Sequence, residues 1–262
     1  MARANPGRRL IAALSSLRQL ELKMSIGSRD DATPTFSDGL MRRIRDVKRL
    51  SVTIDPTTID VVIANLTFLH DAVVASERLL IDAAAQAEAL PRSAFHDNLA
   101  WYYRSHLEEE RGHVTWLRDD LKSAGVAPGV PDRLAMAMVG TQYYLLKHVH
   151  PAALLGYLAV TEGDPTPIEA VEAQELLHGE KLMRFVRFHA VKDLDHRKEV
   201  FELINLAPAQ LHSVISHSAE NVLEYLVQAA SSWKLSKGRS IDARVPQSAP
   251  RSSANGHQRS DP

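Results

Sequence analysis

The segment HLEEERGH, residues 106–113, places two histidines around three consecutive glutamates. Residues at steps of three and four share one face of a helix. One such series is apolar or aromatic at both ends and ionisable at its centre. Its members are Leu99, Tyr103, His106, Glu110, His113, Leu117 and Leu121. This face is predicted to point into the core. His106, Glu110 and His113 are therefore candidate site residues, whereas Glu108 and Glu109 lie off the series and are expected to face solvent.

A second series of this kind lies later in the chain. Its members are Leu182, Val186, His189, Asp193, His196, Val200 and Leu203. A carboxylate on such an apolar face costs several kcal/mol if it stays charged and unpaired, so a partner cation is expected for Asp193. Glu77, with His70, lies on a third apolar series, and Glu162 ends the apolar run GYLAVTE.

Together these residues match a known pattern of metal ligands. Di-iron carboxylate bundles use one Glu from each of two helices and a Glu-x-x-His pair from each of two others. Here the corresponding residues are Glu77, Glu110-x-x-His113, Glu162 and Asp193-x-x-His196. The Glu77–Glu110 separation is 33 residues and the Glu162–Asp193 separation is 31, so the two halves are nearly equivalent. Carboxylates with imidazoles suit two iron or manganese ions better than a structural zinc. Taken singly, each residue could instead be a hydrogen-bonded structural group.

The elements that must position these residues are predicted to be helices, because apolar residues recur at steps of three and four and no segment alternates as a strand would. Turn signals divide the chain into helices near 57–89, 92–123, 132–149, 151–162, 168–206 (with Gly179 as a point of breakage) and 208–235. We predict an all-α domain over residues 51–235. A basic, partly flexible extension with short helices precedes it (1–50), and a disordered tail follows it (236–262).

Composition limits the function classes. Hydrophobic residues make up 45% of the chain and charged residues 24%, with a net charge of −1, as in a soluble globular protein that does not bind nucleic acid. The first fifty residues alone are basic, with eleven Lys and Arg against five Asp and Glu. Cysteine is absent, which excludes disulfides and thiolate ligands and suits the cytoplasm. No uninterrupted apolar run approaches the ~20 residues of a membrane span, so no membrane partner is expected.

The segments HLEEERGH, HVHPAALLGYLAVTE and FHAVKDLDH resemble the haem-oxygenase-like di-iron oxidases and oxygenases, a family of iron-containing redox enzymes. The resemblance covers roughly residues 60–225 and implies a haem-oxygenase-like bundle of about seven helices with two iron ions. The ligands it implies in this sequence are Glu77, Glu110, His113, Glu162, His189, Asp193 and His196. His189, ahead of Asp193-x-x-His196, distinguishes this pattern from that of ferritin-like proteins. Whether His106 and His70 are ligands or neighbours of ligands is left open.

The resemblance also implies an activity. Members use O2 as a co-substrate to oxidise a small organic molecule, such as an amino acid, an amine or a fatty acid, by N-oxygenation, desaturation or oxidative C–C cleavage. Electrons would come from an external donor or from the substrate, and a homodimer is compatible with the fold. Arg104, Arg184 and Arg187 are candidate anchors for a substrate carboxylate. Two alternatives are an iron-binding protein without turnover and a metal-free relative of the thiaminase or quinone-biosynthesis type.

Overall fold

The structure is a computed structural model that describes residues 35–51 and 57–235. The helices are α2 (Phe36–Ser51), α3 (Ile59–Val73), α4 (Ser76–Glu88), α5 (Ala94–Glu110), α6 (His113–Ser123), α7 (Arg133–His148), α8 (Ala153–Thr161), α9 (Ile168–His178), α10 (Arg184–Leu206), the short 3-10 helix η1 (Ala209–Leu211) and α11 (His212–Leu235). These described residues contain no strand. The prediction of an all-α protein is confirmed.

Three long predicted helices are each divided in the structure. The segment 57–89 breaks between α3 and α4, where the hydroxyl of Ser76 donates a hydrogen bond to the Val73 carbonyl at 2.9 Å. The segment 92–123 breaks at Gly112, whose φ of 88° lies in the left-handed region that favours glycine. The expected break near Gly179 is present. The predicted bundle therefore contains more, shorter helices than the periodicity alone indicates.

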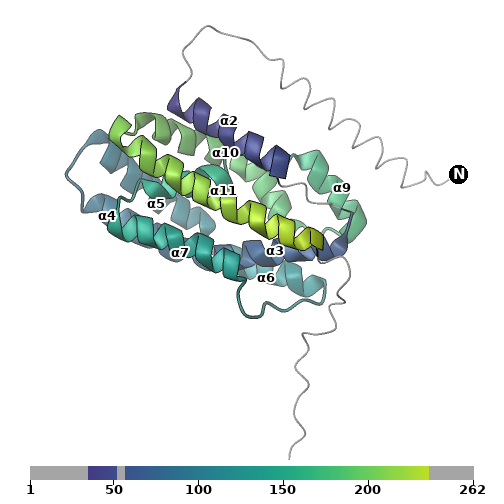
Figure 1. Ribbon diagram of the computed structural model, residues 1–262. Coiled ribbons are helices and arrows are strands. Elements are labelled where there is room, and N and C mark those ends of the chain that lie inside the picture. The colour runs from purple at the N-terminus through teal and green to yellow at the C-terminus, as the bar shows by residue number, and fades with distance from the viewer. Residues whose placement is uncertain (1–34, 52–56, 236–262) are drawn as a thin grey trace, which may run out of the picture.

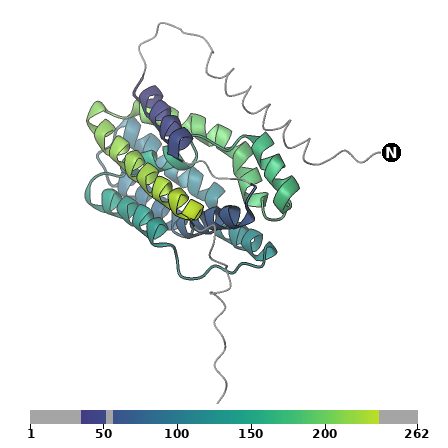
Figure 2. The same ribbon diagram turned by 45° about the vertical axis from the view of Figure 1, so that its right-hand side comes forward.

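The helical part also begins earlier than residue 51. Helix α2, in the segment assigned to the N-terminal extension, packs against α10 and α11. Helix α11 runs across one face of the bundle between α2 and α7 and contacts both (Figure 1). The turned view shows α9 at one end of the bundle, beside α10 (Figure 2). The remaining predictions for residues 1–34 and 236–262 lie outside the described residues.

Helix α8 lies at the centre of the bundle. All its residues from Ala153 to Val160 are buried, and a helix that is apolar all round is expected in a core. Its backbone approaches α11 closely at Gly156, where an added Cβ would lie 2.1 Å from the Ile215 carbonyl oxygen. Glycine is thus required for this contact. The contact fixes the position of α8, which ends immediately before Glu162.

The segment Ile59–Glu88 is long and apolar enough on average to cross a membrane, although it contains no long uninterrupted apolar run. In the structure it is two helices, α3 and α4, which contact α5, α6 and α7 in the bundle. A core helix of a bundle has the same length and composition, so this segment is weak support for a membrane span.

Candidate metal centre

Two groups of histidine and carboxylate side chains lie in the interior between α5, α6, α8 and α10. The first triad consists of Glu110, His113 and His189, and the second triad consists of His106, Glu162 and His196. Within each triad, the candidate ligand atoms all lie within 4.8 Å of one another.

The first triad is assembled around the α5–α6 turn. Glu110 is the last residue of α5 and His113 the first of α6, and the positive φ of Gly112 lets the chain turn between them. Glu110 Oε2 lies 3.0 Å from His113 Nδ1. Helix α10 supplies His189, whose ring centroid is 5.0 Å from that of His113. The Glu-x-x-His pair therefore converges even though no single helix carries it.

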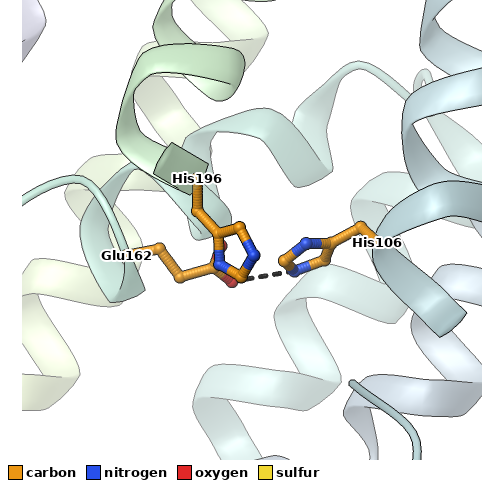
Figure 3. A group of neighbouring side chains, drawn as sticks. All are labelled: His106, Glu162 and His196. Atoms are coloured by element: carbon orange, nitrogen blue, oxygen red, sulfur yellow. Dashed lines mark hydrogen bonds and ion pairs between the residues drawn. The ribbon is translucent and has the colours of Figure 1, made fainter. Parts of the chain in front are cut away.

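The second triad joins three different helices. His106 is one turn before Glu110 on α5, and its Nε2 lies 3.0 Å from Oε1 of Glu162, at the C-terminal end of α8. The other carboxylate oxygen of Glu162, Oε2, is 3.3 Å from Nδ1 of His196 on α10. Figure 3 shows His106 and His196 approaching the carboxylate of Glu162 from different helices.

Asp193 lies next to both triads. Its Oδ1 is 2.8 Å from Nδ1 of His189 and 3.4 Å from Nδ1 of His196. These residues are one turn apart on α10, so the helix itself sets this spacing. Asp193 thus contacts one histidine of each triad, as a carboxylate between two neighbouring cations would.

The donor atoms of the triads are suited to bind a metal because many of them form no hydrogen bond, although some lie in ion-pair contact with each other. In the described part of the chain, nine buried side-chain nitrogen and oxygen atoms have no hydrogen-bond partner, and five of them belong to the triads. They are Glu110 Oε1, His113 Nδ1, His189 Nε2, Glu162 Oε2 and His196 Nδ1. Buried polar atoms are nearly always satisfied, so a convergent group of ligand atoms without hydrogen bonds is compatible with metal binding. Oxygen and imidazole donors without thiolates suit iron or manganese.

Electrostatic contacts shift the protonation of the second triad. Burial opposes ionisation of Glu162, but the charges and hydrogen bonds of His106 and His196 outweigh it and hold the pKa of Glu162 below its usual range. Burial likewise opposes protonation of His196, but contacts with Asp193, Glu162 and Glu109 raise the pKa of His196 to about 11. Without a metal, these contacts favour the protonated form of the His196 imidazole, as a counter-charge of the carboxylates.

The same balance applies to two other histidines of the triads, His106 and His189, whose pKa values are also shifted. Burial opposes protonation of His106, and Glu162 raises its pKa. Burial also opposes protonation of His189, and Asp193 raises its pKa. A divalent ion would replace these protons as the partner of the carboxylates.

Aromatic side chains surround the triads. Trp116, Phe185 and Phe188 pack on the His113 ring, with centroid separations of 5.2, 5.6 and 5.3 Å. Tyr102 stacks on His106 at 5.6 Å, and its buried hydroxyl has no hydrogen-bond partner. Burial, followed by the nearby charge of Glu162, raises the pKa of Tyr102. The sequence series did not identify Tyr102 as a neighbour of the triads.

Helix α10 is held in place at its first turn by a buried acid. Asp120 Oδ2 accepts a hydrogen bond from the backbone N–H of Phe185 at 2.8 Å, and Oδ1 pairs with Arg184 at 2.8 Å. A carboxylate at a helix N-terminus satisfies an otherwise free N–H and favours the helix dipole. This contact from α6 fixes the helix that carries His189, Asp193 and His196.

Six of the seven predicted ligands, all except Glu77, meet at this centre, and the structure also brings in His106, whose role the sequence left open. Glu77 joins neither triad. Its side chain is half-buried in the first turn of α4, and Oε1 accepts a hydrogen bond from the Gly112 N–H at 3.3 Å. Glu77 thus contacts the turn that ends in His113.

The structure also locates His70, whose role was left open, and the two glutamates expected to face solvent. His70 is buried, but its Nδ1 lies 3.2 Å from Asp71 Oδ1, and it belongs to neither triad. Glu108 and Glu109 are both exposed, as expected. Glu109 nevertheless reaches inward, and its Oε2 lies 2.6 Å from His196 Nε2. The series on α5 alone could not reveal this contact, because it depends on how α10 packs against α5.

The candidate arginine anchors are already paired with acids on the protein. Arg104 pairs with Glu88, and Arg184 pairs with Asp120. Arg187 Nε lies 2.6 Å from a Glu175 carboxylate oxygen. These contacts give none of the three a free guanidinium directed at the triads.

Comparison with known proteins identifies the family. A family model described as "iron-containing redox enzyme" matches residues 81–225, a range that includes both triads and Asp193 but not Glu77. The chain belongs to this family. A comparison with curated protein sequences gives no significant match.

Solved structures show the same fold. A domain of unknown function with a haem-oxygenase-like fold from Shewanella denitrificans OS217 aligns with a TM-score of 0.63 and 16% identity, covering 79% of this chain and 95% of its own. A TenA homologue from Pseudomonas syringae pv. tomato DC3000 aligns with a TM-score of 0.63 and 12% identity, covering 78% and 95%. The haem-oxygenase-like fold predicted from the sequence is confirmed.

Proposed function

We propose that the protein is a non-haem di-iron enzyme that uses O2 to oxidise a small organic substrate. The observation that carries the proposal is the convergence of five buried ligand atoms without hydrogen-bond partners in two adjacent triads. Membership of an iron-containing redox family supports iron over other divalent ions. Two irons would supply the electrons that reduce dioxygen and the oxidising power applied to the substrate.

The protein's own residues would hold and shield the metal ions. Glu110, His113 and His189 would hold one ion and His106, Glu162 and His196 the other, with Asp193 between them. His189 would donate its Nδ1 hydrogen to Asp193. Its Nε2, which has no hydrogen-bond partner, would then be the atom that binds the metal. The aromatic side chains on His113 would keep water from the first ion.

The experiment that tests the activity starts from protein loaded anaerobically with Fe(II). It is mixed rapidly with O2, alone and with amino acids, amines or fatty acids, while O2 consumption and visible absorbance are recorded. We expect a transient absorbance change and O2 consumption that one substrate class accelerates. Iron-loaded protein that consumes no O2 with any of these substrates would instead support an iron-binding protein without turnover.

A metal-free activity is the second candidate, because one structural neighbour is described as a TenA homologue. In that case the triad residues would act as acids and bases. Such a protein would show the same activity after chelation, whereas the di-iron proposal expects chelation to abolish activity and iron to restore it.

A further inference from the structure

Glu109 is an exposed residue whose carboxylate reaches a buried histidine of the second triad. Its Oε2 lies 2.6 Å from Nε2 of His196, and its Oε1 lies 3.3 Å from Nζ of Lys192. The Glu109 side chain is 38% exposed, whereas that of His196 is 1% exposed. Glu109 therefore joins the protein surface to the candidate metal centre.

The two nitrogens of His196 have different surroundings. Nε2 is engaged by Glu109, while Nδ1 lies 3.3 Å from Glu162 Oε2 and 3.4 Å from Asp193 Oδ1 without forming a hydrogen bond. The hydrogen bond made by one imidazole nitrogen fixes the tautomer and orientation of the ring, and so decides which nitrogen is left for a metal. In this site that nitrogen is Nδ1.

We propose that Glu109 is a positioning residue that fixes the His196 ring with Nδ1 facing Glu162 and Asp193. The consequence for metal binding rests on the proposed function, but the effect on the ring does not. His106 presents the opposite nitrogen, Nε2, to Glu162. The second triad would thus use one Nδ1 and one Nε2 ligand.

A simpler role for Glu109 is an ion pair that ties α5 to α10 through Lys192. The two roles are separable because the two carboxylate oxygens have different partners. Lys192→Met removes the ion pair and leaves the contact with His196. Glu109→Gln keeps an oxygen that can accept the Nε2 hydrogen but removes the charge. Glu109→Ala removes both contacts.

Glu108 provides a matched control. It is adjacent on α5, is exposed, and forms its own ion pair with Arg111 at 2.8 Å. Glu108→Ala therefore removes an exposed, paired glutamate from the same helix turn without touching His196. Circular dichroism would establish that every variant keeps its helical content.

The first measurement is the histidine side-chain 15N and 1H NMR spectrum of the metal-free protein. We expect the Nε2–H resonance of His196 to lose its hydrogen-bonded shift in Glu109→Ala and to keep most of it in Glu109→Gln, Lys192→Met and Glu108→Ala. A His196 resonance that is the same in Glu109→Ala as in the wild type would overturn the proposal.

The second measurement is Fe(II) affinity. Loss of a hydrogen-bond partner of a metal ligand commonly weakens binding ~10- to 100-fold, and we expect this for one of two ions in Glu109→Ala. We expect Glu109→Gln and Lys192→Met to stay within a few-fold of wild type. Equal losses in Lys192→Met and Glu109→Ala would show that only the ion pair matters. If the wild type binds no iron, the proposed function fails, and the NMR result alone decides the role of Glu109.

Discussion

At the scale of single residues, the main finding is that His106 is part of the candidate centre. Its position on the apolar series of α5 was apparent in the sequence, but its partner, Glu162, lies 56 residues away on another helix. Series of this kind report which residues point inward. They do not report which inward residues meet, because that depends on how helices pack.

Two histidine substitutions test whether His106 is a metal ligand. We expect His106→Ala to reduce iron from two ions to about one per chain, because the second triad loses a ligand while the first is intact. His70→Ala is the control, since His70 is similarly buried but pairs with Asp71 outside the triads. Metal analysis of the two purified variants measures the number of iron ions bound per chain. Two ions retained in His106→Ala would place His106 beside the metal rather than on it.

The first triad has its own prediction. Glu110→Ala or His113→Ala should abolish binding of at least one iron while leaving the helical circular dichroism spectrum largely unchanged. The reason is that each removes a buried ligand atom that has no other hydrogen-bond partner. Full iron occupancy in both variants would contradict the assignment of this triad.

The histidine pKa values give a pH dependence for iron binding. The pKa of His196 is raised to about 11, and those of His106 and His189 are raised above the usual value. A protonated imidazole must lose a proton before it binds a metal, and the raised pKa values favour the protonated forms, so binding should release protons and affinity should rise with pH. Calorimetry in buffers of different ionisation enthalpy measures this release. Binding without proton release would mean that the imidazoles are already neutral.

At the scale of helices, the sequence predicted the buried faces better than the helix boundaries. Every member of the series from Leu99 to Leu121 is buried, although the chain breaks at Gly112. A single glycine with positive φ redirects the chain, while the residues on either side stay in register with the core. Hydrophobic periodicity does not predict where a glycine turns the chain in this way.

The close approach of α8 to α11 gives an element-scale prediction. A Cβ at position 156 would meet the Ile215 carbonyl oxygen at 2.1 Å, so Gly156→Ala must push the helices apart. We expect a loss of ~1–3 kcal/mol in the free energy of unfolding, as for other overpacked cores. Gly140→Ala on α7 is the control. It meets nothing within 4 Å and should stabilise the helix by ~0.5–1 kcal/mol. Equal denaturation midpoints for the two variants would contradict this packing.

At the scale of the whole molecule, the shared fold does not determine the activity. The chain shares its fold with proteins of 16% and 12% identity, one of unknown function and one a TenA homologue. One fold can hold unrelated active sites, so the function must be argued from the residues inside it. Here those residues are histidines and carboxylates that three sequence segments and four helices bring together. The sequence identified most of them because each replaces an apolar residue on a core-facing series. It did not reveal the contact of Glu109 with His196 or that of Glu77 with Gly112, because both depend on how the helices pack.

The most direct test of the central claim is an anaerobic Fe(II) titration of the metal-free, full-length protein, followed by metal analysis after removal of unbound iron. Two adjacent triads predict saturation near two irons per chain, with six histidine and glutamate side chains and Asp193 accounting for the ligands. Saturation at one ion would contradict the two-triad assignment. No specific binding would contradict the metal centre as a whole.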